Sequence, residues 1–113
     1  MTIYGIRSCN KIRNTLAWME RRGVEHTFVD VKKAPPSTTR LAELAAQLGG
    51  VDALVNRRGT TWRRLGLSGQ ELSDEALLDL LHENPSMIVR PLIVAAGLVH
   101  AGYDEQAFER LSE

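Results

Sequence analysis

The sequence predicts an α/β domain in which helices pack against a mixed sheet. Three observations support this. A strand, a helix and a second strand fill the start of the chain; only helical patterns follow across residues 37–84; two strands and a helix come last. A strand–helix–strand unit joins parallel strands by a right-handed crossover, whereas a short turn joins antiparallel strands. We therefore expect both kinds of pairing in one sheet.

The first unit begins with Thr2–Ile6, a short β-branched and aromatic run typical of a buried strand. Arg7–Asn10 form a polar turn. From Lys11 the apolar residues recur at i, i+4 and i+7, which indicates a helix, and Gly23 ends it. Thr27–Val31 is the second predicted strand.

The middle of the chain is expected to be helical throughout. Pro35–Thr38 break the chain and cap a helix that runs to Leu48 and stops at Gly49–Gly50. The remaining helices predicted here are Val51–Val55, Thr61–Leu65 and Ser73–Leu81.

The last third returns to strands. Ile88–Val94 is predicted as a strand, and Pro91 belongs at its beginning because proline cannot donate within a ladder. Leu98–Ala101 follows a glycine and is the expected antiparallel partner. A final helix starts near Asp104.

The composition is typical of one soluble globular domain, which we expect to span residues 1–113. Apolar residues make up 43% and charged residues 25%, and 14 Lys and Arg balance 14 Asp and Glu. This balance predicts no direct binding to nucleic acid or to a membrane surface. The sequence shows no signal peptide and no membrane-spanning run, so we expect a cytoplasmic protein.

Cys9 is the strongest candidate for chemistry, and it is the one cysteine of the chain. It lies between a predicted strand and a helix N-terminus, where unpaired N–H groups and the helix dipole favour a thiolate. Arg7, Lys11 and Arg13 act in the same direction. The alternative is an inert, buried thiol. Because Ile12 stands where a second cysteine of a Cys-x-x-Cys motif would be, Cys9 has no resolving partner within the chain.

Two basic segments are further candidates. Arg90 precedes Pro91, and it would face Cys9 if their two strands were neighbours; the alternative is a surface salt bridge. Arg57 and Arg58 form a basic loop before Trp62, and the alternative there is solvated surface. The three histidines have no metal-ligand spacing, so we predict no metal site at His26, His82 and His100.

At these positions the chain resembles the ArsC/Spx family of thioredoxin-fold proteins, and most closely its YffB-type branch of glutathione-dependent thiol reductases. The resemblance covers essentially the whole length. The segments that carry it are Thr2–Gly5 leading to Cys9, Arg13–Leu16, Pro35–Pro36, Asn56–Trp62 and Asn84–Pro91.

The resemblance implies a thioredoxin-like fold with a mixed four-stranded sheet and an all-helical insertion, approximately 37–84, between the second and third strands. It implies that Cys9 is the catalytic thiol, Arg90 the main active-site arginine and Pro91 a cis-proline beside the thiol. Asn56 stands at the usual arginine position of arsenate reductases, with Arg57 next to it. Their last-hairpin arginine has no match here.

The function implied is thiol–disulfide exchange with glutathione as co-substrate and no bound cofactor. An external thiol or a glutaredoxin-type reductant releases the adduct formed on Cys9. Arsenate reduction is one alternative, and a non-enzymatic Spx-like transcriptional adaptor is another. The residues expected to bind substrate are Arg57, Asn10, Lys11, Arg13 and Pro91.

Overall fold

One mixed sheet organises the chain, which the computed structural model describes over residues 1–113. Its strand order is β2-β1-β3-β4. β1 (Thr2–Gly5) pairs in parallel with β2 (Thr27–Asp30) and antiparallel with β3 (Leu92–Ala95), and β3 pairs antiparallel with β4 (Leu98–Ala101). The mixed four-stranded sheet predicted from the sequence is confirmed.

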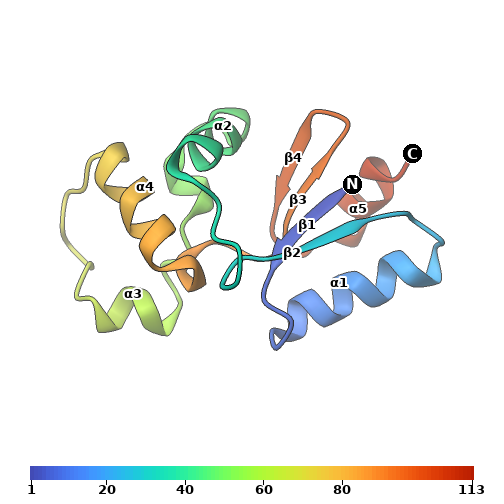
Figure 1. Ribbon diagram of the computed structural model, residues 1–113, viewed down its shortest axis with the longest axis horizontal. Coiled ribbons are helices and arrows are strands. Elements are labelled where there is room, and N and C mark those ends of the chain that lie inside the picture. The colour runs from blue at the N-terminus through green and yellow to red at the C-terminus, as the bar shows by residue number, and fades with distance from the viewer.

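Two helices cover one face of this sheet (Figure 1). α1 (Asn10–Arg21) connects β1 to β2, and α5 (Glu105–Leu111) follows β4. Between the helices and the sheet lies a small apolar cluster that draws on β1, β3 and both helices. Its members are Ile3, Trp18, Met19, Ile93 and Phe108.

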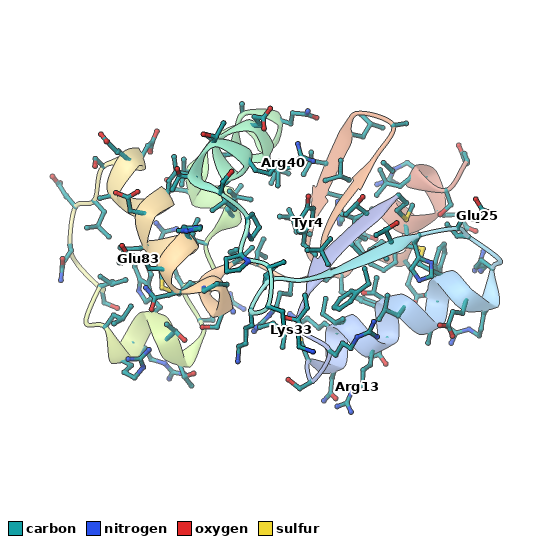
Figure 2. All side chains as sticks on the ribbon, in the orientation of Figure 1. Tyr4, Arg13, Glu25, Lys33, Arg40 and Glu83 are labelled. Carbon is teal, nitrogen blue, oxygen red and sulfur yellow. The ribbon has the colours of Figure 1, made fainter.

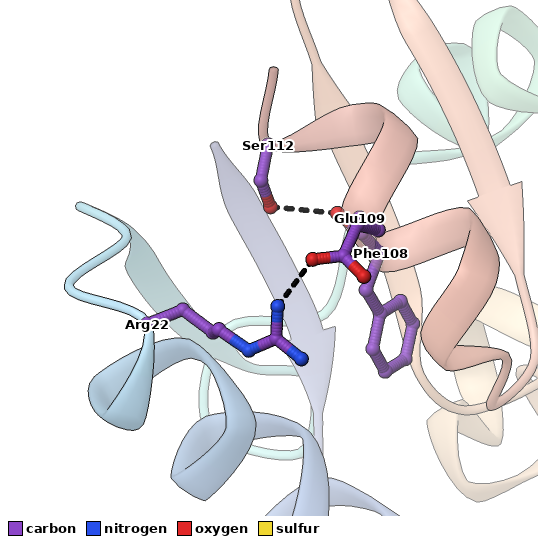
Figure 3. Close-up of polar contacts among 4 residues, drawn as sticks. All are labelled: Arg22, Phe108, Glu109 and Ser112. Carbon is purple, nitrogen blue, oxygen red and sulfur yellow. Dashed lines mark hydrogen bonds and ion pairs between the residues drawn. The ribbon is translucent and has the colours of Figure 1, made fainter.

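Side-chain contacts join the C-terminal end of α1 to α5 (Figure 3). Arg22 forms an ion pair with Glu109, and its guanidinium lies 4.6 Å from the centre of the Trp18 ring. The Trp18 ring meets Phe108 edge to face, with ring centroids 5.6 Å apart. The Ser112 hydroxyl donates to the Phe108 carbonyl oxygen over 2.6 Å and closes the last turn.

The insertion between β2 and β3 is helical, as expected. It contains α2 (Thr38–Leu48), the 3-10 helix η1 (Val51–Leu54), α3 (Thr60–Arg64), α4 (Asp74–Glu83) and the 3-10 helix η2 (Pro85–Met87). Ser37 caps α2 by accepting from the Arg40 N–H, and Gly49 ends it in the left-handed conformation at φ 93°. Figure 1 shows these helices gathered beside the sheet.

A large apolar core joins the insertion to the other face of the sheet. Fifteen buried residues form it, with Leu92 of β3 among them, and Tyr4, Val94 and Val99 pack against it. Figure 2 shows Arg40 of α2 and Tyr4 of β1 close together between the two parts. Arg40 Nε donates to the Tyr4 hydroxyl over 3.5 Å, and this bond raises the pKa of Arg40.

The third strand begins later than the sequence predicted. Ile88 forms an isolated antiparallel bridge with Val55, and the Val89 N–H donates to the Leu54 carbonyl over 2.8 Å. The segment before Pro91 is therefore paired with the insertion rather than with the sheet. Pro91 follows a cis peptide bond and offers no N–H, so the sheet ladder starts at Leu92.

Candidate active site

Cys9 occupies the N-cap position of α1. Its N–H donates to the Ile6 carbonyl over 3.0 Å, and its own carbonyl accepts from the Arg13 N–H over 3.0 Å. The half-buried side chain makes no capping hydrogen bond, and α1 has no acidic residue in its first turn. The free N–H groups of that turn and the positive end of the helix dipole therefore remain available to a thiolate at Cys9.

Gly5 allows the first turn of α1 to pack closely against the end of β1. A Cβ atom at this position would lie 2.1 Å from Cδ1 and 2.6 Å from Cγ1 of Ile12. Ile12 is fully buried, so its side chain has little room to move away. The glycine thus fixes the turn that carries Cys9 relative to the sheet.

Three segments meet around the thiol and enclose a pocket of about 210 Å³. Cys9, Asn10 and Lys11 come from the start of α1, Asn56 comes from the insertion, and Val89 and Arg90 come from the segment before β3. The pocket has no acidic lining residue. Neither the Lys11 ammonium nor the Arg90 guanidinium forms an ion pair with a carboxylate. The pocket is therefore electropositive, and its charges are free to meet an anion.

Arg90 is held in place through its chain neighbours. Val89 is hydrogen-bonded to the insertion, while Pro91 is buried and its carbonyl accepts from the Gly102 N–H over 2.8 Å. The half-buried Arg90 is thus anchored on both sides. The expectation that Arg90 would face the same end of the sheet as Cys9 agrees with this geometry.

Asn56 was not among the predicted site residues, yet it lines the pocket. Its N–H donates to the Met87 carbonyl over 2.8 Å, and its Oδ1 accepts from the Arg58 N–H over 3.2 Å. A Cβ at Gly59 would lie 3.1 Å from the Asn56 Nδ2. The amide is therefore fixed by its own loop. The alignment of Asn56 with the usual arginine position was the signal that pointed to it.

Arg57, which was expected to bind substrate beside Cys9, lies outside this pocket. Its Nη2 donates to Asp52 Oδ1 over 2.7 Å, and its guanidinium lies 5.0 Å from the centre of the Trp62 ring. The local turn accompanies the difference: Arg57 and Arg58 form a turn directly after Asn56, closed by the hydrogen bond from the Arg58 N–H to Asn56 Oδ1. With Asn56 directed to the Cys9 pocket, Arg57 is directed away from it.

Arg13 also lies outside the pocket. Its guanidinium donates to Asn10 Oδ1, and Figure 2 shows it at the outer surface beside the start of α1. Arg7 lies instead over the Phe28 ring, 4.5 Å from the ring centre. The structure therefore brings Cys9, Asn10, Lys11 and Arg90 together, next to Pro91.

Two of the three histidines form hydrogen bonds outside the pocket, and none of the three lines it. His26 and His82 contact the carbonyl oxygens of Val24 and Pro36 through Nδ1, each over 2.8 Å. No three His, Cys, Asp or Glu side chains come together in a way that could hold a metal ion. None of the helices combines the length and apolar character that crossing a membrane requires.

A cysteine at the N-terminus of the first helix of this sheet, with a cis-proline preceding the central antiparallel strand, defines a thioredoxin-like thiol protein. The chain belongs to the ArsC family, whose model matches residues 4–111. The fold and the family predicted from the sequence are thereby confirmed, and the likeness to YffB is confirmed by a solved structure described below.

Individual relatives agree with this assignment. An arsenate reductase of Rhizobium meliloti is 41% identical over 84% of this chain and 69% of its own. The global transcriptional regulator Spx of Listeria innocua is 25% identical over 97% of this chain and 85% of its own. A solved structure named YFFB has 26% identity and a TM-score of 0.90, covering 99% of this chain and 98% of its own. The arsenate reductase relatives support a thiol-based reductase enzyme.

Proposed function

We propose that the chain is a glutathione-dependent thiol–disulfide oxidoreductase with Cys9 as its nucleophile. The observation that carries the proposal is the pocket itself. It places a lone thiol at a helix N-terminus beside two cations, Lys11 and Arg90, that have no carboxylate partner. The thiolate is the attacking species in thiol–disulfide exchange, and these two cations lie beside the position where its charge acts.

The reaction proceeds in two exchanges. The Cys9 thiolate attacks one sulfur of a glutathione-containing disulfide, forms a mixed disulfide with glutathione and releases the other half as a thiolate. Because the chain has no second cysteine, a reduced glutathione thiolate then attacks the adduct. This step yields oxidised glutathione and restores the Cys9 thiolate. One half of that disulfide comes from the substrate and the other from the attacking thiol, so each turnover consumes one reduced glutathione. A glutaredoxin-type protein is a second possible donor.

The cationic and amide groups of the pocket bind the glutathionyl part. The planar Arg90 guanidinium suits a carboxylate in bidentate geometry, and Lys11 offers a second, less directional charge. The Asn56 amide adds a neutral N–H donor from the insertion. We place this chemistry in the reducing cytoplasm, where a single thiol stays free.

Turnover with a mixed disulfide of glutathione and 2-mercaptoethanol tests the proposal. Oxidised glutathione is followed through NADPH consumption by glutathione reductase. Wild-type protein should accelerate the exchange above the uncatalysed rate, and Cys9→Ser should abolish the acceleration. Arg63→Ala, which removes an exposed arginine of α3 away from the pocket, is the matched control. Equal rates for wild type and Cys9→Ser would refute the proposal.

Arsenate reduction is the second candidate, and the identity to the Rhizobium meliloti enzyme favours it. A multiply charged oxyanion needs several convergent donors, but the insertion supplies the neutral Asn56 where arsenate reductases have arginine. We therefore expect weak or absent arsenate turnover in wild-type protein, and an increase in Asn56→Arg. The measurement is arsenite formed with reduced glutathione and glutaredoxin. Strong wild-type turnover would reverse the ranking of the two activities.

The third candidate is a transcriptional adaptor, which the similarity to Spx favours. In that case Cys9 acts as a redox sensor and the chain binds a subunit of RNA polymerase. Retention of the purified polymerase by the immobilised protein, together with no catalysed exchange, would support this role over an enzyme.

A further inference from the structure

A second pocket, which shares no lining residue with the Cys9 pocket, lies within the helical insertion. It has a volume of about 350 Å³, within the range of small-molecule sites. Asp52 and Arg57 line it from the segment around η1, and Trp62, Leu67, Leu72 and Leu77 supply apolar surface from α3, α4 and the loop between them. Nothing in the proposed thiol chemistry uses this pocket.

The polar groups of the pocket are one cation and one anion in contact. Arg57 Nη2 lies 2.7 Å from Asp52 Oδ1, and this is the one hydrogen bond that the guanidinium forms with the protein. Four of the five guanidinium donors are therefore left for a ligand. The side chains of Arg57 and Asp52 are 46% and 77% exposed. Such an exposed pair contributes little to stability, so a ligand can replace it at small cost.

The apolar part of the pocket is preformed. Trp62 is 5% exposed and Leu67 7%, and the Arg57 guanidinium lies over the Trp62 ring. The loop that closes the pocket is fixed by two hydrogen bonds of Gln70. Its N–H donates to the Leu67 carbonyl over 3.2 Å, and its Nε2 donates to the Gly66 carbonyl over 2.8 Å. A ligand would therefore meet an ordered apolar wall next to the charged pair.

We propose that this pocket binds a free apolar α-amino acid. The ammonium and carboxylate of an α-amino acid are attached to one carbon, so they can meet two protein groups that are themselves in contact. The carboxylate pairs with Arg57, the ammonium pairs with Asp52, and the side chain packs on Trp62 and the leucines. A ligand with only one charge would leave one partner of the separated pair without a counterion.

L-phenylalanine is the probe, and 3-phenylpropionate and phenethylamine are the matched compounds that lack its ammonium and its carboxylate. Binding is followed by NMR through the indole N–H of Trp62. L-phenylalanine should bind more tightly than either analogue. Arg57→Ala and Asp52→Asn should each weaken its binding about tenfold or more, the effect of losing a charge-assisted hydrogen bond. Arg63→Ala, an exposed arginine outside the pocket, is the control and should bind as wild type does.

Comparing the compounds across the variants tests which protein group pairs with which charge of the ligand. Asp52→Asn should weaken the binding of L-phenylalanine but not that of 3-phenylpropionate, because 3-phenylpropionate has no ammonium that could pair with Asp52. Equal weakening of both compounds would contradict the pairing of Asp52 with the ammonium. The site itself would be disproved if millimolar L-phenylalanine left the Trp62 signal unchanged, or if it shifted only the signals of Cys9 and Lys11. Neither result would bear on thiol exchange at Cys9, so the two proposals fail separately.

Discussion

Arg90 decides the chemistry of the Cys9 pocket at the scale of single residues. It is half-buried, lines the pocket and has no carboxylate partner, so its charge acts on whatever anion occupies the site. A Cys9 thiolate and a glutathione carboxylate are both such anions. Lys11 alone would leave the pocket with a single, flexible cation.

We predict that Arg90→Ala slows alkylation of Cys9 by iodoacetamide at neutral pH and raises the KM for the glutathione mixed disulfide, each by about tenfold. Arg90→Lys should recover the alkylation rate better than the KM, because it restores the charge but not the bidentate geometry. If Arg90→Ala has the wild-type alkylation rate and the wild-type KM, Arg90 is only a surface residue.

Tyr103 gives a second test at the scale of residues. Its hydroxyl donates to Glu105 Oε2 over 2.6 Å, and this hydrogen bond, aided by partial burial, raises the pKa of Tyr103. The bond stabilises the fold fully below the unfolded tyrosine pKa of about 10, and it is lost as pH rises through the higher folded value. Absorbance titration of a Tyr4→Phe background should show the raised pKa, and Glu105→Gln should lower it. An unchanged titration in Glu105→Gln would remove the stated cause.

At the scale of elements, the contact between β1 and α1 determines where the thiol lies. Gly5→Ala should destabilise the fold by roughly 1–3 kcal/mol, because the new methyl group overlaps Ile12. Ile12→Val removes the Cδ1 atom nearest to that methyl group. The double variant should therefore lose less than the sum of the two single losses. Urea unfolding of the four proteins measures the coupling, and strictly additive losses would show that the two side chains do not clash.

The elements also show what sequence patterns can predict. The helix α1 followed from apolar residues at i, i+4 and i+7, and the parallel pairing of β1 with β2 and the antiparallel pairing of β3 with β4 followed from the lengths of their connections. The start of β3 did not follow, because Ile88 and Val89 have strand-like side chains but pair with the insertion. That pairing is a tertiary contact, which local periodicity does not record.

At the scale of the whole molecule, the candidate site exists because three distant segments converge. Cys9 comes from the sheet and its first helix, Asn56 from the insertion, and Arg90 from the segment that returns to the sheet. The fifteen-residue core holds the insertion against the sheet and so keeps these segments together. An insertion that docked differently would remove Asn56 from the pocket that contains the thiol.

The candidate site, like the fold, could be predicted from the sequence only in part. The roles expected of Cys9 and Arg90 followed from a turn before a helix and from a family pattern, and the pocket brings both residues together. The choice of Arg57 over Asn56 depended on which of two neighbouring side chains points inward. The contacts of Arg57 with Asp52 and Trp62 settle that direction, and no spacing in the sequence encodes them.

The central claim is that Cys9 is an exchange-active thiol that relies on an external thiol for release. Intact-mass spectrometry after incubation with oxidised glutathione tests it most directly. Wild-type protein should gain one glutathionyl group, Cys9→Ser should gain none, and excess reduced glutathione should remove the adduct. A wild-type mass that stays unchanged under oxidising conditions, or an adduct that persists in excess reduced glutathione, would contradict the account.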